Sequence, residues 1–242
     1  MIQKIYIIFF LFLAVQTSAQ EKKRDVSDFD DAYLKESKAE NSELSSRIKT
    51  FPQNIQDLNK QVSQAIRSND DTKALELALE MDKLYPNNAD IKNFIGKRQA
   101  KAQDYASALK SFDEAIKIDS NNKWFYINKA SVQAENKQIE EALKTMETLL
   151  VLQPNWSIAY NMKASLLREL NQQSESLRAY EMALMGEPKS AQIYTNRGDL
   201  YLELSKEKEA IADYKKALEI QPDYARAKEN LNKTLKTASD KK

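Results

Sequence analysis

The residue types that most often perform enzyme chemistry are either missing from this chain or poorly spaced for it. Its 242 residues include no histidine and no cysteine. This excludes the usual neutral general base, thiol nucleophiles, disulfides and the commonest transition-metal ligands. Carboxylates are plentiful, but neighbours such as Glu140 and Glu141 do not face one another on a helix. Carboxylate catalysis and oxygen-ligand Ca²⁺ or Mg²⁺ sites survive the composition, yet no residue pair is placed to form them. No catalytic, metal-binding or cofactor-binding residue is predicted.

One polar residue type recurs at a nearly constant spacing. An asparagine returns about every 34 residues, at Asn59, Asn93, Asn128, Asn161, Asn196 and Asn230. Each amide offers one acceptor and two donors, which could pair with a peptide backbone. The elements that position such a row must repeat with the same period.

Proline marks the same period. Pro154, Pro188 and Pro222 stand 34 residues apart, Pro86 lies twice that distance before Pro154, and Ser120 occupies the position between them. A fixed period of this size predicts a solenoid of stacked helix pairs. Only 3 glycines and 5 prolines are present, which is also unlike an all-β chain.

Three columns of residues share this period in the second half of each unit. They stand twelve, eight and five residues before the turn: Ala74, Ala108, Ala142, Ser176 and Ala210; Ala78, Phe112, Met146, Tyr180 and Tyr214; Met81, Ala115, Leu149, Ala183 and Ala217. Spacings of four and three place the columns on one helical face. Gly96 and Gly198 share a column in the first half with Val62, Ala130 and Ala164, which predicts close helix contact there.

These residues resemble the tetratricopeptide repeat. In the last unit, Tyr194, Gly198, Ala210, Tyr214 and Pro222 match that family's motif, whereas Lys92 and Ser120 depart from it in an earlier unit. The resemblance covers residues 55–237. It implies an all-α, right-handed solenoid of units 55–88, 89–122, 123–156, 157–190 and 191–224, followed by a capping helix over 225–237 and a frayed tail over 238–242.

The N-terminus has the layout of an export signal. Lys4 precedes an unbroken apolar run over 5–15, and small residues follow over 17–19. We expect cleavage after Ala19, which leaves Gln20 first; the run is shorter than the roughly 20 residues of a membrane span. The alternative is an uncleaved anchor, and a lipoprotein is excluded because no cysteine is available. Residues 20–53 are predicted to be a flexible polar linker with one weak helix starting near Ser27.

The resemblance also implies where a ligand binds. In this family the first helix of each unit lines a concave groove, near its second, fifth, sixth and ninth residues, which we call the groove positions. Asn93, Asn128, Asn161 and Asn196 fall there and form a candidate ladder for the backbone of an extended peptide, beside Trp124, Ile127 and Ile158. Alternatively, the asparagines are a solvated face and Trp124 is a core residue.

We therefore predict an exported scaffold or adaptor that binds a protein or peptide segment in the groove, with a bacterial periplasm favoured. The formal charge of +1 argues against nucleic acid as a partner. No stable membrane insertion is expected after signal cleavage. The alternatives are a structural homo-oligomer, a non-catalytic subunit of an envelope complex or, less favoured, a carboxylate-dependent enzyme. Neither the partner's identity nor the oligomeric state follows from the sequence.

Overall fold

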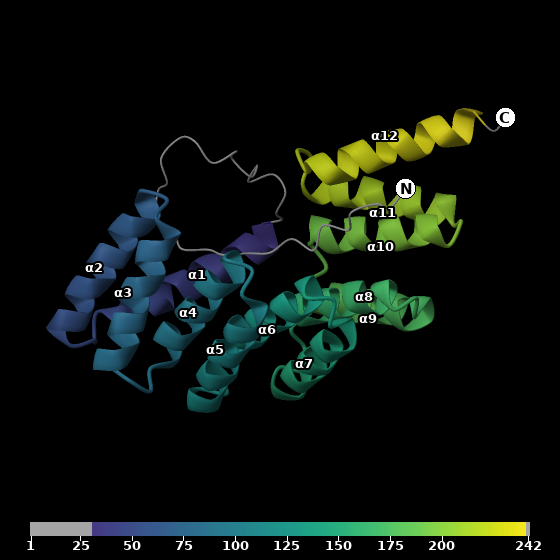
Figure 1. Ribbon diagram of the computed structural model, residues 1–242. Helices are drawn as coiled ribbons and strands as arrows, with labels where there is room; N and C mark the ends of the chain where they lie inside the picture. The colour runs from purple at the N-terminus through teal and green to yellow at the C-terminus, as the bar shows by residue number, and fades with distance from the viewer. Residues whose placement is uncertain (1–30, 241–242) are drawn as a thin grey trace. The chain divides into compact units, whose positions relative to one another are not determined.

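The computed structural model describes residues 31–240, which form twelve α-helices and contain no β-strand (Figure 1). The predicted all-α fold of repeated helix pairs is confirmed. The signal peptide predicted for residues 1–19 lies outside the described residues. In chain order the helices are α1 (Asp31–Ile48), α2 (Gln53–Arg67), α3 (Asp71–Leu84), α4 (Ala89–Lys101), α5 (Tyr105–Ile118), α6 (Lys123–Glu135), α7 (Ile139–Leu152), α8 (Ser157–Glu169), α9 (Gln173–Gly186), α10 (Ala191–Glu203), α11 (Glu207–Ile220) and α12 (Ala225–Asp240).

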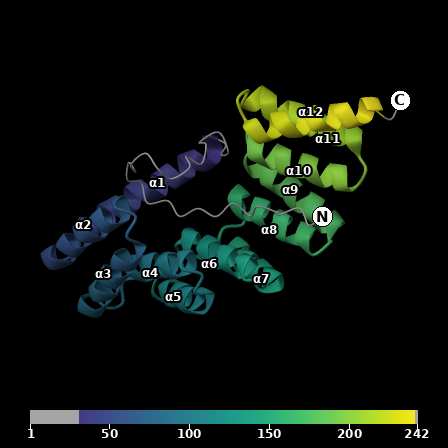
Figure 2. The same ribbon diagram turned by 45° about the horizontal axis from the view of Figure 1, so that its top comes forward.

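The helices belong to two compact units. Unit 1 contains residues 39–152, and unit 2 contains residues 31–38 and the chain from residue 153 onward, so that the boundary falls inside α1. Unit 1 holds the pairs α2–α3, α4–α5 and α6–α7, and unit 2 holds α8–α9, α10–α11 and the last helix, α12 (Figures 1 and 2). Within each unit, the second helix of one pair packs against the first helix of the next.

The three predicted columns form the core between the helices of each pair. Every member of the columns is buried, and the most accessible, Met81, is only 5% exposed. The small residues let two helices approach, while Phe112, Met146, Tyr180 and Tyr214 fill the space beside them. Burying one large apolar side chain contributes roughly 1.5–3 kcal/mol, so a column repeated along the chain stabilises every pair in the same way.

Two glycines allow the closest of these contacts. A Cβ atom at Gly96 in α4 would lie 2.8 Å from Cε1 of Phe112, and one at Gly198 in α10 would lie 2.7 Å from Cε1 of Tyr214. Carbon atoms pack best at about 3.5–4.0 Å. The packing reason predicted for glycine in the middle of these helices is therefore confirmed.

The turn inside each pair repeats as faithfully as the core. Two positions after the last residue of the first helix of each pair stands a residue with φ between 57° and 64°, and these residues are Asn69, Gln103, Lys137, Asn171 and Ser205. At the first turn, the amide of Asn69 donates to the Ile66 carbonyl oxygen at 3.0 Å and the amide of Asp70 donates to that of Ala65 at 2.9 Å. This is a Schellman motif, which satisfies the last carbonyls of a helix. The next helix follows at once, because the Asp70 carboxylate caps α3 by accepting from the Lys73 amide at 2.9 Å.

In repeat 89–122, Lys92 replaces the aromatic residue that the motif has near the start of the first helix. Its Nζ lies 2.8 Å from Asp82 Oδ2 and 2.8 Å from Glu114 Oε2. Burial by itself would lower the pKa of Lys92, but the hydrogen bonds to the two carboxylates outweigh that effect and raise it. An ionic contact thus joins α4 to α3 and α5 at a position where three of the other repeats have a tyrosine.

The two ends of the described chain differ from the expectation. A helix of 18 residues, α1, lies within the segment expected to be mostly linker; its polar side chains find partners on repeat helices remote in sequence, which the segment itself does not reveal. At the other end α12 continues to Asp240, past the expected end at residue 237. Its buried face contains Ala227 and Thr234, whereas Leu235 is 44% exposed.

Candidate peptide-binding site

In unit 1 the structure joins two of the predicted asparagines. The amide nitrogen of Asn128 on α6 donates to Oδ1 of Asn93 on α4 at 2.8 Å. Both side chains are half-buried. Within residues 31–240, the amide nitrogen of Asn93 and the amide oxygen of Asn128 have no protein partner. This pair therefore keeps donors and an acceptor that a peptide backbone could use.

The predicted apolar residues of unit 1 lie on the same helix as Asn128. Trp124 sits in the first turn of α6, where its backbone amide donates to Oδ1 of Asn122 at 3.0 Å, and its ring is half-buried. Ile127 is 8% exposed and contributes to the core. Trp124 thus keeps some accessible surface, whereas Ile127 offers little to a ligand.

Unit 2 contains a second pair of asparagines. The amide nitrogen of Asn196 on α10 donates to Oδ1 of Asn161 on α8 at 2.9 Å, and Nη1 of Arg226 on α12 donates to Oδ1 of Asn196 at 2.8 Å. Asn196 is only 7% exposed. Asn196 therefore links three helices, while Asn161 is the more accessible member of the pair.

Asp199 continues this polar network towards the C-terminal helix. Its Oδ1 accepts from Tyr214 Oη at 2.7 Å and from the Asn230 amide at 2.7 Å, while Oδ2 pairs with Arg226. Burial, reinforced by the charge of Asp199, raises the pKa of Tyr214 well above its ordinary value. The phenol therefore stays protonated as a donor, and the network fixes α12 against α10.

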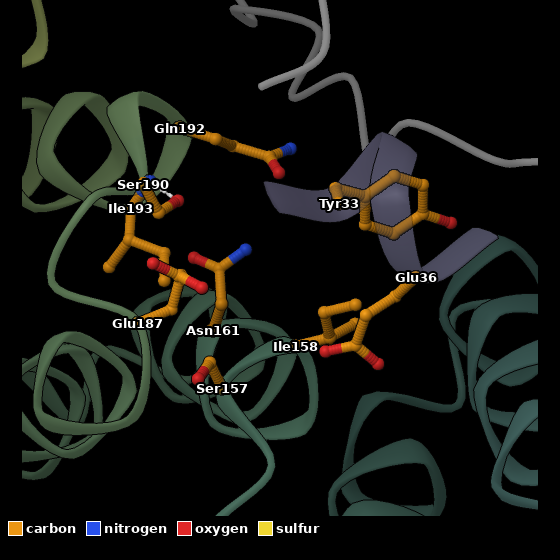
Figure 3. A pocket seen from close by; sticks show the side chains of 9 residues that line it. All are labelled: Tyr33, Glu36, Ser157, Ile158, Asn161, Glu187, Ser190, Gln192 and Ile193. Carbon is orange, nitrogen blue, oxygen red and sulfur yellow. Dashed lines mark hydrogen bonds between the residues drawn. The ribbon is translucent and has the colours of Figure 1, made fainter. Parts of the chain in front are cut away.

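The described part of unit 2 also contains a small, shallow pocket that is open to solvent. Ile158 and Asn161 from α8 and Gln192 from α10, all at groove positions, line it together with Tyr33 and Glu36 from α1 (Figure 3). The Glu36 Oε2 atom accepts a hydrogen bond from Nε1 of Trp156 at 2.6 Å. The pocket therefore combines an apolar wall, side-chain amides and two carboxylates, those of Glu36 and Glu187.

Charged groups surround the corresponding positions of unit 1. Arg47 of α1 donates from Nε to Oδ2 of Asp90 at 2.8 Å and from Nη2 to Oδ1 at 3.0 Å, and Nη2 also donates to Glu40 Oε1 at 3.0 Å. Lys97, a half-buried groove position, has a pKa lowered to about 8. Burial is the main cause and the neighbouring charge of Arg98 adds to it, while the carboxylate of Glu40 acts in the opposite direction.

The structure thus assembles the predicted site residues into two groups rather than one. Asn93, Asn128, Trp124 and Ile127 lie in unit 1; Asn161, Asn196 and Ile158 lie in unit 2. Their role as a peptide ladder stays a prediction. Sequence reasoning did not find Tyr33, Glu36 or Arg226. The one available signal was the spacing of Tyr33 and Glu36, which places them on one face if the segment is helical.

Neither a metal centre nor a membrane span is evident in the described chain. Over residues 31–240, acidic side chains do not gather in groups of three or more that could hold a metal ion. Over the same range, each helix is too short or too polar to cross a bilayer.

Known proteins share this architecture. Tetratricopeptide repeat family models match residues 99–166 and residues 191–224. No curated protein matches the chain at a significant level. Among solved structures, MamA from Desulfovibrio magneticus, solved from its residue 41 to the end, is 19% identical with a TM-score of 0.62, and the match covers 72% of this chain and 98% of the solved one.

Two further solved structures carry the same fold. A thermophilic tetratricopeptide repeat protein from Thermus thermophilus is 19% identical with a TM-score of 0.60, over 75% of this chain and 98% of its own. YrrB, a tetratricopeptide repeat protein with an unusual peptide-binding site, is 20% identical with a TM-score of 0.54, over 70% of this chain and 87% of its own. Two segments of this chain thus match tetratricopeptide repeat models, and these solved structures share its fold.

Proposed function

We propose that this protein is an interaction scaffold that binds a peptide or protein segment at the groove positions of its repeats. The observation that carries the proposal is the pairing of amides between successive first helices, Asn93 with Asn128 and Asn161 with Asn196. Each bridge holds two amides in a fixed orientation, so that a partner does not pay the full cost of ordering them. Tetratricopeptide repeats suit this role, and YrrB is one with a peptide-binding site.

The test removes a complete asparagine pair. Replacing both members at once, Asn93→Ala with Asn128→Ala, leaves no buried amide without its partner and favours helix. Partners are first captured from an envelope fraction with the wild-type protein, and the recovered partner is then titrated against the variant. Each net hydrogen bond contributes about 0.5–1.5 kcal/mol, so we expect affinity to fall by roughly 10- to 100-fold.

The control replaces two exposed residues on α7, the partner helix of α6, as Lys144→Ala with Thr148→Ala. This variant should bind the partner as the wild type does, and circular dichroism should show equal helicity in all three proteins. If the asparagine variant binds with unchanged affinity and intact helicity, the partner does not use the groove positions of unit 1.

We also propose that the protein acts outside the cytoplasm, in a periplasm or as a secreted protein. The signal-like layout of residues 1–19 supports this. Mass spectrometry of the natural protein should find Gln20 as the first residue. Intact Met1 in the membrane fraction would instead indicate an uncleaved anchor.

A further inference from the structure

The groove positions of unit 2 are not empty, because residues 31–38 of α1 lie over them. Tyr33 and Glu36 stand three residues apart, on the same side of the helix, and both line the pocket formed by Ile158, Asn161 and Gln192 (Figure 3). This segment is not part of any repeat pair. It occupies the place that a bound segment would take.

Two specific contacts hold this segment in unit 2. The Glu36 carboxylate accepts the indole hydrogen bond of Trp156, whose side chain is 7% exposed. Tyr33 lines the pocket, and burial, followed by the charge of Glu36, raises the pKa of its phenol. A half-buried aromatic ring beside a charge-assisted hydrogen bond is the composition expected of an anchor in a binding interface.

The same helix also meets groove positions within unit 1. Arg47 makes its two hydrogen bonds to Asp90, the second residue of unit 89–122, and Glu40 accepts from the amide of Asn122 at 3.4 Å. These contacts are polar and partly exposed, and such ion pairs contribute about 0–1 kcal/mol each.

The composition of α1 indicates that it is held by few strong contacts. Its large apolar residues are Tyr33, Leu34, Leu44 and Ile48, and the rest of its 18 residues are polar or alanine. None of the described helices packs against α1 as closely as the two helices of a pair pack against each other. A polar helix of this length is marginal on its own in water, so its order depends on the surface beneath it.

From these contacts, and on the basis of the function proposed above, we propose that the groove positions recognise a mostly polar helix rather than an extended strand. The helix carries an aromatic residue and a glutamate three positions later, and α1 is a tethered copy of this ligand that a partner helix displaces.

The test adds a fluorescein-labelled synthetic peptide with the sequence of α1, residues 31–48, to the full-length protein and measures its binding. Full-length protein carrying Tyr33→Ala and Glu36→Gln loosens its own α1 and should bind this peptide at least ten-fold more tightly than the wild type does. A peptide carrying the same two changes should bind the loosened protein at least ten-fold more weakly. A matched protein variant, Lys35→Ala with Lys38→Ala, alters two exposed residues of the same helix and should behave as the wild type does.

A second measurement reports release of α1 directly. In a Trp124→Phe background, Trp156 is the remaining tryptophan of the chain. Its emission should shift when Tyr33 and Glu36 are replaced, and trypsin should cut faster after Arg47. If α1 is released by these criteria and the peptide still binds no more tightly than to the wild type, the proposal is wrong, although the partner titration can still support the scaffold function. Unchanged emission and proteolysis in the double variant would equally overturn it, because α1 would not depend on these two anchors.

Discussion

The glycine at position 96 shows how one residue sets the distance between two helices. Phe112, which faces it, is 1% exposed and cannot turn into solvent, and the Ala108 carbonyl oxygen would lie 3.1 Å from an added Cβ. Alanine favours helix over glycine by about 1 kcal/mol. The steric cost must therefore exceed that gain for glycine to be the better residue here.

We expect Gly96→Ala to destabilise the protein. Overpacking a core costs about 1–3 kcal/mol, which leaves a net loss of about 1 kcal/mol after the gain in helix propensity. Urea unfolding measures the difference. Adding Phe112→Met should restore part of the loss, because the next repeat, residues 123–156, has alanine and methionine at the same two positions, Ala130 and Met146. A single variant more stable than the wild type would show that Phe112 can move aside.

Lys97 should make stability depend on pH in the alkaline range. Its pKa is about 8 in the folded chain, and an unperturbed lysine titrates near 10.4. Between these values the unfolded chain binds more protons, so the contribution of Lys97 to the free energy of unfolding rises as pH rises. Below pH 8 Lys97 is charged in both states, and the net cost of burying part of that charge lowers the free energy of unfolding by a constant amount.

Lys97→Met should therefore increase stability at pH 7, by about 1–3 kcal/mol, since one pKa unit corresponds to about 1.4 kcal/mol and the side chain keeps some solvent contact. The difference between the two proteins should shrink as pH approaches 10. Chemical denaturation at pH 7, 8, 9 and 10 gives the comparison directly, and a difference that is constant with pH would contradict the lowered pKa.

At the scale of the helix, small residues decide how closely α11 approaches its neighbours. Ala217 is fully buried in a cluster with Ala191, Tyr224 and Ala227. We expect Ala217→Leu to lower stability by about 1–3 kcal/mol through overpacking. Ala212→Leu makes the same change at an exposed position of α11 and should leave the melting temperature nearly unchanged. Equal melting curves for the two variants would contradict the assigned packing of α11.

What the sequence could predict follows from the repeat itself. A residue such as Ala183 or Tyr214 has counterparts one period away, so its burial is supported by several positions at once. The position of α1 has no such support. Its contacts join residues far apart in the chain, with Glu36 and Trp156 separated by 120 positions and Glu40 and Asn122 by 82. The same limit applies to the asparagines, whose regular spacing predicted a row but not that they bond to one another in pairs.

At the scale of the whole molecule, stability and recognition use separate sets of residues. The columns of the second helices and the small residues opposite them are buried and identical in role from one pair to the next. The groove positions differ from pair to pair, from Asp90 and Lys97 in α4 to Gln192 and Asn196 in α10. A stack of this kind can therefore vary its ligand without altering the contacts that hold its pairs together.

The turns inside the pairs have a consequence of their own. Each first helix is followed by a residue in the left-handed conformation, yet none of the five is glycine, the residue that adopts this conformation most easily. For an ordinary side chain that conformation costs about 1–2 kcal/mol, and asparagine tolerates it better. Gln103, Lys137 and Ser205 thus lower the thermal stability of the protein, and replacing any of them with glycine or asparagine should raise it. Because none of the three is a groove position, this protein could adapt to a hotter environment without changing what it recognises.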